Sequence, residues 1–166
     1  MKAVLTDSIE NVEEQISQMK EAELPTNLVE MVSITKPFHI PNDGKRIVLI
    51  DFGSINDILR ELNLRKMDIT VVPYDISAQE IDSLHTDAIV LSNGPGNPMD
   101  LPKEIEIIQS LIGKYPILGI GLGHQLLALA SGASVYKLKV GHSGANYPIK
   151  HMETGKKQLQ ACNNSY

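Results

Sequence analysis

The sequence predicts an α/β fold with a doubly wound, mostly parallel sheet. Short, continuous apolar runs alternate with amphipathic segments along residues 45–133, which is typical of buried parallel strands joined by crossover helices. Two glycine-rich loops, 92–98 and 119–125, each follow a predicted strand. The 166 residues are 42% hydrophobic but include no tryptophan and two phenylalanines. We therefore expect a core of ordinary size built from aliphatic side chains.

The first 44 residues are expected to form a helix and a linker. The motif Asp7-x-x-Glu10 is a capping box, and apolar residues then recur at spacings of three and four, which predicts a helix over 8–20. Residues 25–45 carry three prolines and an Asn-Asp-Gly turn, so they are interpreted as a linker with a short strand at 28–34. The chain is therefore expected to divide into a segment 1–44 and a domain 45–166.

The domain alternates strands and helices. Strands are predicted from the apolar runs at 46–51, 68–72, 87–91 and 116–120. Helices are predicted to open at Ser54-x-x-Asp57, at the capping box Ser77-x-x-Glu80, at Leu101 and after the turn 121–125. After Gly132 the pattern changes to short strands at 134–140 and 145–150, with no closing helix. We therefore expect a fold that is truncated at its C-terminus.

Composition argues against several classes of protein. The net charge is -5, with 15 Lys+Arg against 20 Asp+Glu, whereas nucleic-acid-binding domains usually carry a basic face. No apolar run approaches the roughly 20 residues that span a bilayer, and the apolar stretch at the N-terminus is too short for a signal peptide. Cys162 is the single cysteine, and the histidines lack metal-ligand spacing. We expect a cytoplasmic protein with no metal and no cofactor.

The two glycine-rich loops lie where an open parallel sheet binds its ligands, beyond the carboxyl ends of the strands. Residues 117–125 place small side chains around a strand-to-helix turn, which is the environment of a nucleophile elbow. Such a turn directs backbone N–H groups and the positive end of a helix at one point, which suits an oxyanion. The apex is Gly121, which has no side chain to attack a carbonyl. His124 is expected to be a polar residue packed beneath the elbow rather than a base.

Three motifs stand out: Ser92-Asn93-Gly94-Pro95-Gly96-Asn97-Pro98, Gly119 to Ala133 and Gly141-His142-x-Gly144-Ala145-Asn146-x-Pro148. Together they resemble a known family, the small, glutamine-hydrolysing subunit of carbamoyl-phosphate synthase, which is a class I glutamine amidotransferase. The resemblance covers nearly the whole chain and implies a flavodoxin-like class I glutaminase fold. It also implies L-glutamine as ligand, the large synthetase subunit as partner, and ammonia supply for carbamoyl phosphate in pyrimidine or arginine biosynthesis.

The resemblance also implies roles for individual residues. The family's nucleophile is a cysteine where this chain has Gly121, and its histidine and glutamate lie on a later His-Pro-Glu segment that this sequence does not reach. No catalytic residue is therefore assigned. The segment 163–166 would close over the substrate. The residues implied to hold glutamine are Gly94, Gly96, Leu122, Gln125, Asn163, Ser165 and Tyr166.

Further departures from the family fall mostly on polar site positions: Ile55 replaces a lysine, Asn97 an aspartate, Ser143 an arginine and Tyr147 a histidine. The chain is therefore interpreted as a degenerate copy, a pseudoenzyme that binds glutamine or the large subunit without hydrolysis. Three alternatives remain open. The chain could be a non-catalytic interaction or regulatory module, one half of a split active glutaminase, or a non-functional remnant.

Overall fold

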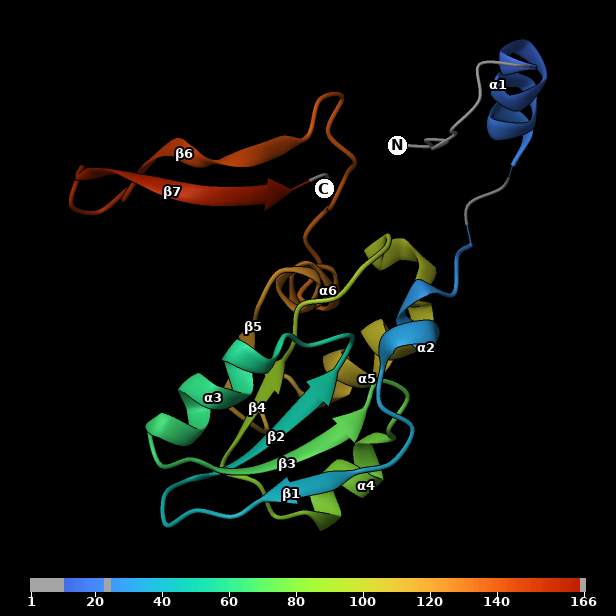
Figure 1. Ribbon diagram of the computed structural model, residues 1–166. Helices are drawn as coiled ribbons and strands as arrows, with labels where there is room; N and C mark the ends of the chain where they lie inside the picture. The colour runs from blue at the N-terminus through green and yellow to red at the C-terminus, as the bar shows by residue number, and fades with distance from the viewer. Residues whose placement is uncertain (1–10, 23–24, 165–166) are drawn as a thin grey trace.

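The computed structural model describes residues 11–22 and 25–164, and its central feature is a five-stranded sheet (Figure 1). The strand order is β1-β3-β2-β4-β5. The four strands β3, β2, β4 and β5 are parallel, and β1 pairs with β3 in the antiparallel direction. The predicted mostly parallel α/β sheet is thereby confirmed. The strands are β1 (Phe38–Ile40), β2 (Arg46–Asp51), β3 (Asp68–Pro73), β4 (Ala88–Leu91) and β5 (Ile117–Gly119).

Helices cover both faces of the sheet. On one face α3 (Asn56–Leu64) packs its apolar side over a buried cluster centred on Leu49, Ile69 and Val90. The opposite face carries the larger cluster, which is covered by α4 (Ala78–Ser83), α5 (Pro102–Leu111) and α6 (Leu122–Ala130). The chain leaves β2 toward β3 on one side and later returns to β4 on the other side. The direction therefore changes between β2 and β4, where such folds place their ligand sites.

Of two predicted helix starts, the structure confirms the one at Ser77 and contradicts the one at Ser54. The capping box at Ser77 is present: the Glu80 N–H donates to Ser77 Oγ at 3.3 Å, and the Ser77 N–H donates to Glu80 Oε2 at 2.9 Å. The predicted start at Ser54 is wrong, because α3 begins at Asn56 without a side-chain cap. The Ser54 N–H instead donates to Asp51 Oδ1 at 2.7 Å, so Ser54 belongs to the turn that ends β2.

The structure corrects part of the prediction for the N-terminal segment. Helix α1 (Val12–Glu21) confirms a helix in this region, whereas the capping box at Asp7 lies outside the described residues. The strand predicted at 28–34 is wrong, since α2 (Leu28–Val32) occupies that stretch and buries Val29 against the core. The supposed linker also contributes β1 to the sheet. The division of the chain at residues 44 and 45 stays a prediction.

The C-terminal strands form an antiparallel hairpin of β6 (His142–Lys150) and β7 (Lys157–Asn164). The strand predicted at 145–150 lies within β6. The strand predicted at 134–140 is wrong: that stretch is irregular and has no strand partner among the described residues. Cys162 lies in β7 and is half-buried. Figure 1 shows the hairpin standing away from the five-stranded sheet, beyond α6.

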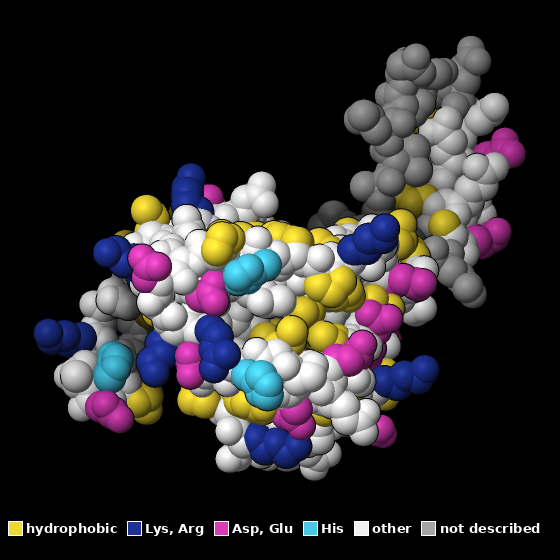
Figure 2. All heavy atoms as spheres, turned by 90° about the horizontal axis from the view of Figure 1, so that it is seen from below, with side chains coloured by type: hydrophobic (Ala, Val, Ile, Leu, Met, Phe, Trp, Pro, Cys, Tyr) yellow, Lys and Arg dark blue, Asp and Glu magenta, His cyan; other side chains and the backbone are white. Residues whose placement is uncertain are grey.

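The face seen from below carries acidic and basic side chains interspersed with small apolar patches (Figure 2). The charges of the two signs therefore largely offset one another over this face. Among the helices of the described residues, none combines the length and the apolar character needed to cross a bilayer.

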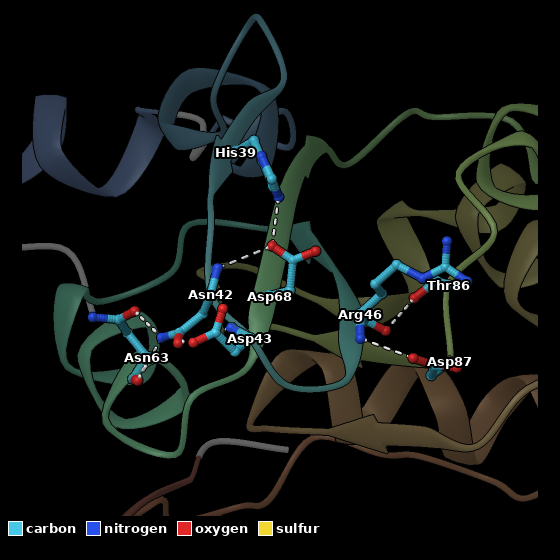
Figure 3. A network of polar contacts seen from close by, with 8 residues as sticks. All are labelled: His39, Asn42, Asp43, Arg46, Asn63, Asp68, Thr86 and Asp87. Atoms are coloured by element: carbon cyan, nitrogen blue, oxygen red, sulfur yellow. Dashed lines mark hydrogen bonds and ion pairs between the residues drawn. The ribbon is translucent and has the colours of Figure 1, made fainter.

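Polar contacts hold the loops at the amino ends of the central strands (Figure 3). Asp68, the first residue of β3, accepts a hydrogen bond from His39 Nε2 at 2.7 Å and one from the Asn42 N–H at 3.2 Å. The Arg46 N–H donates to Asp87 Oδ2 at 2.9 Å. These contacts tie the segment before β2 to the starts of β3 and β4.

Stability is expected to fall in acid partly through Asp68. The hydrogen bond from His39, helped by the Asn42 N–H, lowers the pKa of Asp68 in the folded protein. A carboxyl group with a lowered folded pKa stabilises the fold above its unfolded pKa, and this contribution is lost as the pH falls through the folded value. Urea unfolding between pH 7 and pH 3 should therefore show a shallower acid loss for Asp68→Asn than for the unmodified protein. Identical acid slopes would contradict this assignment.

Candidate functional site

A sharp turn joins β5 to α6, as the sequence predicts for an elbow. Its apex is Gly121, with φ of 57° and ψ of -116°. This φ lies in the left-handed range, which side chains with a Cβ disfavour. The Gly123 N–H donates to the carbonyl oxygens of Ser92 and Ile120, both at 3.0 Å. The turn is thus tied to the loop that follows β4.

Different physical constraints favour glycine at the three glycine positions of this turn. A Cβ at Gly123 would lie 2.4 Å from the Leu91 carbonyl oxygen, and a Cβ at Gly119 would lie 2.6 Å from that of Gly123. Packing therefore excludes side chains at both positions. At Gly121 the nearest atom to a built Cβ is Asn93 Cβ at 3.3 Å. A Cβ at the apex would therefore be in tight contact with Asn93, without the severe overlap found at Gly119 and Gly123, and the positive φ also favours glycine.

A cavity of about 750 Å³ opens beside the elbow. Gly121 and Gln125 line it, together with Ser134 and Tyr136 from the irregular segment after α6. His124 also lines the cavity and is exposed, so the prediction that it packs beneath the elbow is wrong. The reason is its position on the face of α6 that points away from the sheet. The volume lies within the range of small-molecule sites.

The crevice between β2 and β4 is covered by α2. The Ser33 hydroxyl, just after α2, donates to the Asp51 carbonyl oxygen at 2.6 Å. A Cβ at Gly53 would lie 2.7 Å from Val32 Cγ2, and one at Gly96 would lie 3.7 Å from Leu28 Cδ1. Because α2 occupies this crevice, the open cavity lies to its side, at β5 and α6.

The structure brings some of the residues assigned to glutamine together. Gly94 and Leu122 are neighbours, since a Cβ at Gly94 would lie 2.9 Å from Leu122 Cδ2. Gln125 lines the cavity with Gly121. Gly96 instead lies against α2. Asn163 lies in β7, where its Oδ1 accepts a hydrogen bond from Ser143 Oγ at 3.2 Å. Ser165 and Tyr166 lie outside the described residues.

A buried carboxylate organises the loop after β2, and the sequence reasoning missed it. Asp51 is 3% exposed. Its Oδ2 accepts from the Ile34 N–H at 2.8 Å, and its Oδ1 accepts from the N–H groups of Gly53 at 3.2 Å and Ser54 at 2.7 Å. The available signal was an acidic residue that directly continues a buried apolar run. Such a residue needs several donors in the fold.

Asn93 connects three parts of the site. Its Nδ2 donates to the Gly53 carbonyl oxygen at 3.3 Å, and its Oδ1 accepts from the Ile55 N–H at 3.3 Å. Its Cβ is the atom nearest to a Cβ built at Gly121. The loops after β2 and β4 are therefore held in a fixed relation to the elbow. The sequence indicated the loop but not this role of Asn93.

The apex of the elbow carries no side chain. Gly121 places a hydrogen atom where a side chain could face the cavity. In the described part of the chain, no group of three or more His, Cys, Asp or Glu side chains is placed to hold a metal ion. The start of α6 offers backbone N–H groups and the positive end of a helix. These features favour a carbonyl or carboxylate ligand.

Comparisons with known proteins agree with this geometry. The family described as "Glutamine amidotransferase class-I" matches residues 48–166. The chain is 49% identical to the carbamoyl phosphate synthase pyrimidine-specific small chain of Bacillus subtilis, and 48% identical to a carbamoyl phosphate synthase small chain of Listeria monocytogenes. Each match covers 100% of this chain and 46% of the relative. The chain therefore spans about half the length of these relatives.

A solved structure shares the fold. It is a protein from Thermoplasma acidophilum described as a subunit of GMP synthase, with a TM-score of 0.54 and 34% sequence identity. The match covers 61% of this chain and 52% of the other. The arrangement described above is therefore one that also occurs in a solved protein.

Proposed function

Because the chain belongs to the class I glutamine amidotransferase family, we propose that it binds L-glutamine beside the elbow without hydrolysing it. We propose further that it is the glutaminase-type part of a carbamoyl phosphate synthase small chain, on the basis of its similarity to proteins of that name. Gly121 at the apex of an otherwise well-built turn is the observation on which the proposal rests.

Three features support glutamine binding. The elbow presents the start of α6, whose positive end favours an oxygen of the ligand. Gln125 offers an amide group to the same cavity, and a side-chain amide can both donate to and accept from another amide. The neighbouring loop is held rigidly by Asn93. A site that is already ordered loses less entropy when its ligand binds.

The absence of hydrolysis follows from the residue at the apex. The family resemblance implies a cysteine there, which would attack the amide carbon of glutamine to form a thioester and release ammonia. Gly121 has no atom that could form this bond. Nucleophile and base act as a unit, so loss of the nucleophile alone removes several orders of magnitude in rate. The elbow N–H groups would still bind a carbonyl oxygen, but no tetrahedral intermediate would form.

A large synthetase subunit is the proposed partner, and the cytoplasm the proposed compartment. An observation on α1 favours an interaction role: none of its residues is buried, and Val12 and Ile16 on its apolar side are each 41% exposed. An amphipathic helix usually buries its apolar side against another surface. A non-catalytic interaction module is therefore the second candidate function. Both candidate functions, glutamine binding and the interaction module, would serve the same biosynthetic role in a pyrimidine or an arginine pathway.

Calorimetric titration with L-glutamine tests the proposal, together with an assay for released ammonia. We expect saturable binding with ammonia release at the level of the buffer. Gln125→Ala should weaken binding by about tenfold, since a hydrogen-bonding side chain is lost. Gln109→Ala, an exposed glutamine on α5, is the matched control and should leave binding unchanged. Absence of binding would refute the glutamine site, and ammonia release above background would refute the loss of hydrolysis.

A further inference from the structure

A second cavity, of about 320 Å³, lies between α2 and the first turn of α5, away from the elbow. Glu30 of α2 lines it, together with Tyr74 from the loop after β3. Asp100, which ends the short 3₁₀ helix η1 (Pro98–Asp100), and Glu104 of α5 also line it. None of these residues belongs to the proposed glutamine site.

Glu104 is the unusual residue of this cavity. It is 8% exposed, yet among the described residues its carboxylate has no hydrogen-bond or ion-pair partner. No side-chain polar atom of the described residues is both sealed from solvent and unpaired. The carboxylate oxygens of Glu104 must therefore open onto the cavity that the residue lines. A buried carboxylate with free oxygens is a strong acceptor for a ligand that donates hydrogen bonds.

The charges of the cavity favour a cation. Three carboxylates line it, those of Glu30, Asp100 and Glu104, against one ammonium group, that of Lys103. Burial raises the pKa of Tyr74, and the negative charges of Glu30, Asp75 and Glu104 raise it further. The negative potential of several elements therefore converges in one small volume.

The walls indicate the shape of the cation. Buried Val29 and Leu101 provide an apolar surface, and Tyr74 adds an aromatic ring. A planar guanidinium group can donate two parallel hydrogen bonds to one carboxylate and can also stack on an aromatic ring. An ammonium group offers only a point charge. We propose that this cavity binds a small alkylguanidinium compound, with Glu104 as its principal acceptor.

Titration of the 166-residue protein with ethylguanidinium chloride tests the proposal, with amide shifts followed by NMR. We expect saturable shifts at Tyr74 and Glu104, with a dissociation constant of about a millimolar, as suits a ligand of this size. Ethylurea, which has nearly the same shape but no charge, should give no saturable shift. Sodium chloride at the same ionic strength controls for screening.

Two matched variants identify the acceptor. Glu104→Gln should weaken ethylguanidinium binding by about tenfold or more, whereas Glu106→Gln, an exposed residue of the same helix, should change it by less than about twofold. Glu30→Gln removes an exposed charge of the cavity without touching the core, and it should also weaken binding. This variant tests the proposal even if Glu104→Gln fails to fold. Unsaturable shifts, equal binding of ethylurea, or equal losses in Glu104→Gln and Glu106→Gln would overturn the proposal. Glutamine binding at the elbow is measured separately and does not depend on these outcomes.

Discussion

Gly123→Ala is expected to lower the free energy of unfolding by about 3 kcal/mol. The added methyl group would lie 2.4 Å from the Leu91 carbonyl oxygen and 2.6 Å from Leu91 Cβ. Leu91 belongs to the buried central strand β4, which cannot move aside without disturbing the core. Helix α6 would have to shift instead, and the hydrogen bond from the Gly123 N–H to the Ser92 carbonyl would be strained. Urea unfolding followed by circular dichroism measures the loss.

Gly121→Ala is the matched control within the same turn. Its methyl group would lie 3.3 Å from Asn93 Cβ, which a shift of a few tenths of an ångström would relieve, so the expected loss is chiefly the cost of a left-handed φ, about 1 to 2 kcal/mol. The comparison separates packing from backbone strain. If Gly121→Ala destabilised the protein as much as Gly123→Ala, the apex would have no room for a side chain. That result would also remove the reason for treating Gly121 as a replaced nucleophile.

Asp51→Asn is expected to destabilise the protein by about 3 kcal/mol. Three backbone N–H groups donate to the buried Asp51 carboxylate, and they come from Ile34 on one side and from Gly53 and Ser54 on the other. Hydrogen bonds to a charged group are each worth about 1.5 to 3 kcal/mol. An asparagine has one acceptor oxygen, so its NH₂ group would face at least one of these donors. Faster hydrogen exchange at the Ile34 and Ser54 amides should accompany the loss.

Asp57→Asn provides the control for Asp51→Asn. Asp57 is 67% exposed and pairs with Arg60 at 2.9 Å on the surface of α3. Exposed ion pairs contribute about 0 to 1 kcal/mol. The same chemical change should therefore leave unfolding nearly unaffected. Equal losses for the two variants would show that Asp51 does not anchor the loop after β2.

The continuous apolar runs were reliable guides to the central strands. Residues 46–51 form β2 as predicted, and their burial on both faces explains why the run is unbroken. The capping box at Ser77 was also predicted correctly, because both of its partners lie within four residues. The glycine-rich loops located the elbow for the same reason. In each case the controlling interactions are local or periodic along the chain.

The errors arose where distant contacts decide the local structure. Residues 28–34 contain β-branched side chains that suit a strand, yet residues 28–32 form α2. The next two residues, Ser33 and Ile34, bond to Asp51, which lies eighteen and seventeen residues away. Ser54 suits a helix cap, yet its N–H is taken by the same carboxylate. The stretch 134–140 has strand-like residues, but a strand forms only where a neighbour offers its backbone groups.

The sequence by itself determined the succession of the central strands and helices along the chain, the position of the turn at Gly121 and the absence of a nucleophilic side chain there. Only the tertiary structure decided that a Cβ would be less crowded at Gly121 than at Gly119 or Gly123, that α2 covers the crevice between β2 and β4, and that Asn93 joins the loops of the site. The physical reason is the separation along the chain of the residues that interact. Burial leaves a periodic trace in the chain, whereas a contact such as that between Asn93 and Gly53, forty residues apart, exists only once the sheet has formed.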